Sequence, residues 1–248
     1  MRPRRLVREP PAGDPWDLEA LARARRLGDW MFSRLPPSSG ARVAEVGAGI
    51  GTFSGRFLDA GARELLLIEP APSCVVCLHA RYGADDRVRI VDEALEDAPE
   101  DWAGRYDLVV CQNVLEHIAD DRAAFVAMAS ALRPGGTLAL LVPAHPWLFN
   151  RLDRRFGHHR RYSMKRLRGL AADAGLTVDR LERFNALGVL GWLVEGLAPA
   201  PAIRPRAVRV FEHALGPWRR LEDRVGMPVG LSLILHARQP PAGTGARS

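Results

Sequence analysis

The chain has 248 residues, 47% of them hydrophobic, and its 35 Lys and Arg against 29 Asp and Glu leave a formal net charge of +6. These values fit a globular protein with a substantial core and exclude a disordered or fibrous chain. No run of about 20 uncharged apolar residues is present, and the basic residues 1–11 lack the apolar core of a secretory signal, so we expect a cytoplasmic protein without a transmembrane segment.

Almost all of the basic residues are arginines, because Lys165 is the only lysine. Phosphate contacts in nucleic-acid binding need cations, but these arginines are scattered along the chain and are not interleaved with aromatic residues. A general replacement of lysine by arginine accounts for the composition equally well. We therefore expect no nucleic-acid partner.

Apolar residues at helical spacing predict a first helix that begins at Asp14-Pro15 and ends before Pro36-Pro37. Strands and helices then alternate. Strands are predicted at Arg42–Val46, Glu64–Ile68, Val88–Val91, 106–111 and 137–142. Helices are predicted between them at 52–60, Pro72–Tyr82 and 121–132. Strands that are apolar throughout and separated by helices predict a parallel sheet covered on both faces.

The pattern changes after the fifth predicted strand. Residues 143–162 are a polar, basic and aromatic loop, which we call the lid loop. Ser163 is then placed to cap a helix that ends at Gly175. Two last strands are predicted at 176–184 and 231–238, with a helical insertion at 185–228 between them.

The segment Glu45-Val46-Gly47-Ala48-Gly49-Ile50-Gly51 ends the first predicted strand and leads into the next helix. Glycines at such a turn let the backbone come close to a ligand. In a nicotinamide-binding fingerprint the third glycine would stand at Thr52, and here it is Gly51. Glu45 places a carboxylate where it repels a pyrophosphate but suits the ammonium group of an amino-acid-bearing ligand. The turn therefore favours S-adenosylmethionine, with Glu45, Gly47, Ala48, Gly49 and Gly51 as cofactor-binding residues.

Polar residues also follow the next three predicted strands. Glu69 ends the second strand, where a carboxylate can accept hydrogen bonds from both ribose hydroxyls. After the third strand, Asp92 or Glu93, with a preference for Glu93, is placed to accept from the adenine amino group while Ala94 packs on the ring. Asn113 follows the fourth strand, beside the expected methionine portion of the cofactor.

Together with the turn Leu132-Arg133-Pro134-Gly135-Gly136, these motifs make the chain resemble the class I S-adenosylmethionine-dependent methyltransferases, nearest to the ubiquinone O-methyltransferase-like group. The resemblance covers residues 41–175 and the final strand. It implies a Rossmann-like α/β fold with a doubly wound, seven-stranded, mostly parallel sheet whose last strand is antiparallel. It also implies that S-adenosylmethionine, which leaves as S-adenosylhomocysteine, lies over the carboxyl ends of strands one to four.

Some enzymes of that group carry two glutamates and a histidine after the fourth strand, where a divalent cation has been proposed. The matching residues here are Asn113, Glu116 and His117. Neutral Asn is a poorer ligand than a carboxylate for a hard cation. We therefore expect no metal site and turnover without a divalent metal.

The lid loop follows the fifth strand, at the rim where the acceptor is expected to enter. A loop of about 20 residues inside a compact domain is more often functional than not. Histidine can take a proton at neutral pH, so His158, His117 and His159, in that order, are the candidate general bases. Tyr162 is a candidate orienting group, and a backbone-bonded structural role is the alternative for His117.

Three other residues of the lid loop are candidates to bind the acceptor. Arg160 and Arg161 have the fork of donors that clamps a carboxylate or phosphate, and Trp147 offers an aromatic surface. The alternative is that both arginines pair with carboxylates of the protein and order the loop.

The insertion begins with an apolar stretch that is too short to cross a membrane. Such a segment suits an apolar acceptor, a homodimer interface or contact with a membrane surface, and packing onto its own domain is the alternative. We expect a single domain over 1–248, as a monomer or homodimer. Its parts are an N-terminal helical segment (1–37), a cofactor-binding core (41–175), an acceptor-side helical insertion (185–228) and a flexible tail (239–248).

These observations predict methyl transfer to an oxygen of a small-molecule acceptor, a hydroxyl or carboxylate of a hydrophobic or anionic natural product. The glycine spacing and Glu45 argue against an NAD-dependent oxidoreductase. A non-catalytic, cofactor-binding or regulatory partner subunit is the other alternative. The fourth strand is not followed by an Asn-Pro-Pro-Tyr type signature, which argues against an RNA base as acceptor.

Overall fold

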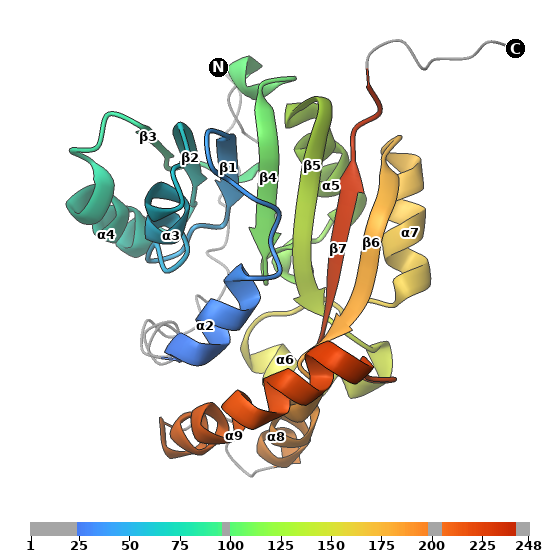
Figure 1. The fold of residues 1–248 in the computed structure, drawn as a ribbon. Helices are drawn as coiled ribbons and strands as arrows, with labels where there is room; N and C mark the ends of the chain where they lie inside the picture. Colours follow the sequence, from blue (N-terminus) through green and yellow to red (C-terminus); the bar gives the residue numbers. More distant parts are fainter. Residues whose placement is uncertain (1–23, 96–99, 198–204, 242–248) are drawn as a thin grey trace, which may run out of the picture.

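The computed structural model describes residues 24–95, 100–197 and 205–241 (Figure 1). Their seven strands form one sheet in the order β3-β2-β1-β4-β5-β7-β6. The strands are β1 (Arg42–Val46), β2 (Glu64–Ile68), β3 (Val88–Val91), β4 (Tyr106–Gln112), β5 (Leu132–Pro143), β6 (Thr177–Phe184) and β7 (Ser232–Arg238). Neighbours among β1 to β5 pair in parallel, and β7 is antiparallel to both β5 and β6. The predicted seven-stranded fold with an antiparallel last strand is confirmed.

Helices cover both faces of this sheet. The described helices are α2 (Arg25–Phe32), α3 (Ser54–Asp59), α4 (Pro72–Tyr82), α5 (Asp121–Ala131), α6 (Arg151–Arg155), α7 (Met164–Asp173), α8 (Ala186–Leu197) and α9 (Pro205–Val225). The described residues also form the short 3-10 helices η2 (Glu100–Trp102), η3 (Leu115–His117) and η4 (Pro146–Leu148). The start of the first predicted helix, Asp14-Pro15, lies outside the described residues.

The core consists of two apolar layers, one on each face of the sheet. Phe57 of α3 and Leu78 of α4 are fully buried on one face, and Phe125 of α5 and Leu167 of α7 are fully buried on the other. Buried on both faces, the central parallel strands need apolar side chains in both directions. This explains why their sequences are mostly apolar. The bounds of β1, β2 and β3 match the prediction, whereas β4 ends at Gln112 instead of 111 and β5 begins at Leu132 instead of 137.

The parallel strands β1 to β5 place their carboxyl ends at one edge of the sheet, and the residues predicted to bind the cofactor and the acceptor follow these ends. In Figure 1 the helices α6, α8 and α9 lie beyond the ends to which the β4 and β5 arrows point. The lid loop, expected to be irregular, contains η4 and α6. Helix α6 begins with a capping box in which the Asn150 and Asp153 side chains bond to each other's backbone N–H groups.

Helix α9 holds two other helices through buried or half-buried carboxylates. Glu212 accepts the backbone N–H groups of Arg26 and Leu27, both at 2.9 Å, at the start of α2. Glu222 accepts the N–H of Asn185 at 2.6 Å, just before α8. The first N–H groups of a helix have no partner within the helix, so these carboxylates satisfy them. The insertion therefore packs onto its own domain.

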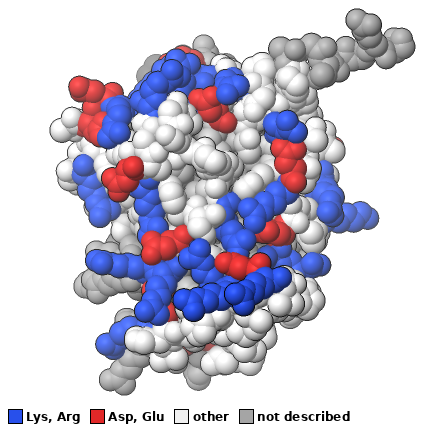
Figure 2. Space-filling view, in the orientation of Figure 1, with Lys and Arg blue, Asp and Glu red and all other residues white. Residues whose placement is uncertain are grey.

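The surface carries charges of both signs. Figure 2 shows basic side chains interspersed with acidic ones over the visible face. Many are paired, as Arg87 is with Asp85 and Arg238 with Asp179. Among the described residues, no helix has the length and apolar character that a bilayer span requires.

Candidate active site

The turn between β1 and α3 depends on its three glycines. Gly47, Gly49 and Gly51 have φ angles of 71°, 56° and 80°, a region that residues with side chains rarely adopt. A Cβ at Gly47 would lie 2.2 Å from Cγ2 of Val114, and a Cβ at Gly51 would lie 2.6 Å from the Tyr82 ring. A Cβ at Gly49 would meet no described atom within 4 Å. The turn is packed at both ends and open at Gly49, where a ligand can approach the backbone.

The carboxylate of Glu69 joins this turn to the end of β2. Its Oε2 accepts the N–H of Gly49 at 2.7 Å, and its Oε1 accepts the N–H of Ala71 at 2.9 Å. Burial raises the pKa of Glu69, and the two N–H bonds oppose that rise. Each carboxylate oxygen has a second lone pair. Glu69 can therefore hold the turn and accept from ribose hydroxyls at the same time.

Glu45 is buried in β1, where its Oε2 accepts a hydrogen bond from Ser54 Oγ at 2.6 Å. Burial raises the pKa of Glu45 to about 8, although the bond from Ser54 lowers it. At neutral pH the side chain is therefore mostly protonated. The predicted contact with an ammonium group requires this carboxyl group to release its proton when the ligand binds.

Strand register brings the other cofactor motifs beside the turn. Val46 of β1 pairs with Ile68 of β2 and Cys111 of β4, and Ile68 pairs with Val91 of β3. The residues that follow these four strand ends are therefore neighbours, as the sequence predicted. Asp92, Glu93 and Ala94 follow β3, with both carboxylates exposed.

Asn113 follows β4 and is exposed, with a left-handed φ of 53°. Its N–H donates to the Leu141 carbonyl at 2.8 Å, so the backbone is fixed while the side chain faces outward. The preceding residue, Gln112, has a buried amide whose oxygen and nitrogen find no hydrogen-bond partner in the described part of the chain.

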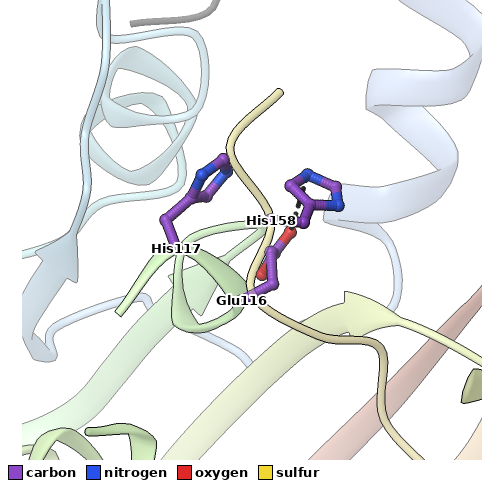
Figure 3. A group of neighbouring side chains, drawn as sticks. All are labelled: Glu116, His117 and His158. Atoms are coloured by element: carbon purple, nitrogen blue, oxygen red, sulfur yellow. Dashed lines mark ion pairs between the residues drawn. The ribbon is translucent and has the colours of Figure 1, made fainter. Parts of the chain in front are cut away.

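Glu116, His117 and His158 form a polar cluster beyond the end of β4 (Figure 3). The first two belong to η3, and His158 comes from the lid loop. Nε2 of His158 lies 3.9 Å from Oε1 of Glu116, and the rings of His117 and His158 meet edge to face with centroids 4.8 Å apart. Within the described ranges, neither oxygen of the buried Glu116 accepts a hydrogen bond.

Burial determines the charge of this cluster. It raises the pKa of Glu116 to about 8 and, with the neighbouring histidines, lowers the pKa of His117 to about 4. At neutral pH Glu116 is mostly protonated and His117 is neutral. The cluster can bond to a polar group of an acceptor. Its ligand atoms, all within 4.8 Å of one another, also form a carboxylate and imidazole set that suits a divalent cation.

The sequence argument against a metal rested on Asn113, which is not a member of this cluster. The third donor is His158, which the fold brings to Glu116 from the lid loop, far along the chain. Spacing within one segment could not identify it.

Protein contacts occupy the two lid arginines. Arg160 donates to the carbonyls of Ile118 at 2.8 Å and Ala119 at 2.7 Å. Arg161 is 3% exposed and donates from Nε to Asp153 at 2.7 Å. These contacts favour the alternative hypothesis, in which both arginines order the lid loop, over the hypothesis that they bind an anionic acceptor.

The other predicted lid residues lie in different surroundings. Tyr162 is fully buried, and its hydroxyl donates to the Leu115 carbonyl at 3.1 Å. His159 has an exposed side chain, and its N–H donates to the Glu116 carbonyl at 2.8 Å. Trp147 is 65% exposed beside the half-buried ring of His145, with centroids 5.4 Å apart. The sequence interpretation missed His145 and Asp153. For Asp153, the capping pattern with Asn150 was a readable signal.

Three comparisons with known proteins bear on this site. A family model described as "Methyltransferase domain" matches residues 20–181. A Xanthomonas axonopodis "Ubiquinone biosynthesis O-methyltransferase" is 37% identical over 115 residues, which cover 45% of this chain and 46% of that protein. The chain therefore aligns with about half the length of this curated relative.

Solved structures show the same fold. An S-adenosylmethionine-dependent methyltransferase from Mesorhizobium loti matches with a TM-score of 0.61 and 17% identity, covering 87% of this chain and all of that one. A geranyl diphosphate methyltransferase solved with S-adenosylmethionine matches with a TM-score of 0.63 and 13% identity, covering 91% of each chain.

The sheet order and the glycine turn at the end of β1 match the fold of the class I S-adenosylmethionine-dependent methyltransferases. The chain belongs to the methyltransferase domain family.

Proposed function

We propose that this protein transfers the methyl group of S-adenosylmethionine to a hydroxyl oxygen of a small, largely apolar acceptor. The supporting observation is the position of His158, next to Glu116 at the carboxyl edge of the sheet where the cofactor motifs also lie. A hydroxyl bound there would have a proton-accepting nitrogen on one side and the cofactor on the other.

In this mechanism the cofactor supplies the electrophile, and the protein aligns the reactants. The glycine turn, Glu69, Asp92 or Glu93, and Asn113 hold the cofactor. When bound, S-adenosylmethionine would supply an electrophilic methyl group that the acceptor oxygen could take, with the carbon–sulfur bond breaking and S-adenosylhomocysteine as the leaving group. The hydroxyl proton passes to Nε2 of His158. His117 and His159 are the next candidates for this role, and we assign Tyr162 to ordering the site.

The proposed acceptor chemistry has two supports. The curated relatives are named for O-methylation in ubiquinone biosynthesis, which favours a ring hydroxyl on a hydrophobic molecule. Helix α8 also exposes apolar side chains at helical spacing: Leu190, Leu193, Val194 and Leu197. An apolar acceptor tail, a second copy of the chain or a membrane surface would cover them. We propose a cytoplasmic monomer or homodimer, with Trp147 at the acceptor entrance.

The experiment is an assay of S-adenosylhomocysteine formation with catechol and with a catechol that carries a decyl chain. We expect turnover, and a lower KM for the decyl compound. His158→Ala should lower kcat at least tenfold, whereas His79→Ala, at an exposed position on α4, should not. If neither catechol is methylated, the proposed acceptor class is wrong.

The same assay tests the metal alternative, for which Glu116, His117 and His158 offer a set of possible ligands. We expect activity to survive dialysis against a chelator. If it is lost and a divalent cation restores it, these three residues hold the ion. A cation there would supply a Lewis acid that lowers the pKa of the acceptor hydroxyl. Binding of S-adenosylmethionine without turnover on any acceptor would instead favour the non-catalytic alternative.

A further inference from the structure

Asp153 is a fully buried carboxylate on which three segments of the chain converge. Its Oδ1 accepts from Arg161 Nε at 2.7 Å and contacts His158 Nδ1 at 2.9 Å. Its Oδ2 accepts the N–H of Asn150 at 2.9 Å and Nε1 of Trp192 at 3.3 Å. A buried charge is stable only when it is paired and hydrogen-bonded, and these donors meet that condition.

The contacts determine which nitrogen of His158 is basic. The Arg161 guanidinium, the Asn150 N–H and the Trp192 N–H all donate to this side chain, so it is held as the carboxylate that accepts hydrogen bonds. An ionised carboxylate can only accept hydrogen bonds, so Nδ1 of a neutral His158 must carry the proton. Nε2 is then the accepting nitrogen, and it is the one that faces Glu116.

Trp192 ties the same arrangement to α8. Its ring is nearly parallel to that of His158, with an angle of 8° and centroids 6.4 Å apart. The Arg161 guanidinium lies 4.5 Å from the centre of the Trp192 ring. The His158 ring is therefore held by its Nδ1 contact to Asp153 and lies alongside a residue of the insertion.

We propose that Asp153 is a positioning residue for methyl transfer. It holds His158 with Nε2 directed to the acceptor hydroxyl, and the Trp192 N–H on the same carboxylate makes this orientation depend on the placement of α8. The role rests on the proposed function, because it requires His158 to receive the proton. Carboxylate–imidazole pairs orient general bases in this way in enzymes of other folds.

The first test is the tautomer of His158 in the intact protein with isotope-labelled histidine. NMR correlation of ring nitrogens with ring protons, assigned through His158→Ala, should show the proton on Nδ1. In Asp153→Asn the amide can donate, so the proton should move to Nε2. A wild-type His158 with its proton on Nε2 overturns the proposal without any need for the variant.

The second test separates positioning from folding. Asp153→Asn should lower kcat for the decyl catechol at least tenfold, with its KM and the Kd of S-adenosylmethionine changed less than about twofold. The matched control is Asn150→Ala, which removes the side-chain bonds to the Leu152 and Asp153 N–H groups and to the Trp192 carbonyl but keeps the Asp153 carboxylate and its contact with His158. We expect the control to lose stability but keep kcat and the tautomer. An equal loss of kcat in the control means that Asp153 only maintains the fold.

The two proposals fail in different ways. If His158→Ala leaves turnover unchanged, both the base and the positioning role are wrong. If turnover depends on His158 but Asp153→Asn changes neither the tautomer nor kcat, only the role of Asp153 is wrong.

Discussion

Asn113, His145 and Asn185 all adopt left-handed backbone conformations just after the ends of β4, β5 and β6, with φ angles of 53°, 61° and 64°. Asparagine and histidine enter this region more readily than most residues with a side chain, but even for them it is uncommon. The N–H of His145 donates to the Tyr162 carbonyl at 2.8 Å, which fixes it in place. Backbone strain of this kind gathers at functional sites, and all three residues follow strands that end at the carboxyl edge of the sheet.

Glu69 offers a direct test of cofactor binding. In Glu69→Gln one carboxylate oxygen becomes an NH₂ group. This group cannot accept a hydrogen bond from a ribose hydroxyl, and it places a donor opposite a backbone N–H that is also a donor. Each bond to a charged group contributes about 1.5–3 kcal/mol, so calorimetry should show at least tenfold weaker binding of S-adenosylmethionine. The control is Glu64→Gln, at the opposite end of β2, where Glu64 pairs with Arg105. Equal affinity in wild type and Glu69→Gln would remove Glu69 from the cofactor site.

Glu45 makes a prediction about stability and pH. The folded protein keeps this proton up to a pKa of about 8, against an ordinary value of 4.5. Between these values the unfolded chain binds fewer protons than the folded one, so the contribution of Glu45 to stability falls as pH rises. In Glu45→Gln this contribution is absent. Urea unfolding across the window should show the variant gaining stability relative to wild type with rising pH, and parallel curves would contradict the assignment.

At the scale of elements, the helices and strands that a local pattern of apolar and turn residues determines could be predicted from the sequence. The first three strands and α4 have the predicted bounds. For β1 and β2 the reason is that buried parallel strands are apolar runs that end at turn residues. Helix α6 was missed because five residues are too few to show a helical period. The cluster of Glu116 with His158 was missed because it depends on how the lid loop packs on η3.

The lid loop makes a prediction that separates bracing from acceptor binding. Arg161 donates from Nε to Asp153 and from Nη1 to the Ala144 carbonyl at 3.1 Å. Lysine cannot form both bonds from one position, so Arg161→Lys should lower the free energy of unfolding by about 1.5–3 kcal/mol. Arg168→Lys, at an exposed position on α7, should change it little. If Arg161→Lys keeps its stability but raises the acceptor KM, the arginine binds the acceptor.

On the scale of the whole molecule, the site is assembled from distant parts of the chain. Trp30 of α2 donates from Nε1 to Asp223 of α9 at 3.1 Å, so the N-terminal helix and the insertion are joined beside the sheet. Helix α8 contacts both α6 and α9. These contacts between helices that are remote in sequence have no local pattern. The candidate cofactor residues follow strand ends whose positions the local pattern predicts, whereas the surroundings of the candidate acceptor residues depend on packing between distant segments.

Cofactor binding should stabilise the whole molecule, because only the folded chain places the glycine turn and Glu69 together in one binding site. At a free concentration one hundred times Kd, a ligand that binds only the folded state adds about 2.7 kcal/mol. For a domain of this size we expect the melting temperature to rise by roughly 5–10 °C with S-adenosylmethionine. NAD at the same concentration should cause no shift, and Glu69→Gln, if its Kd is tenfold weaker, should retain about half of the stabilisation. A shift of equal size with NAD would mean that the turn does not discriminate between the two cofactors.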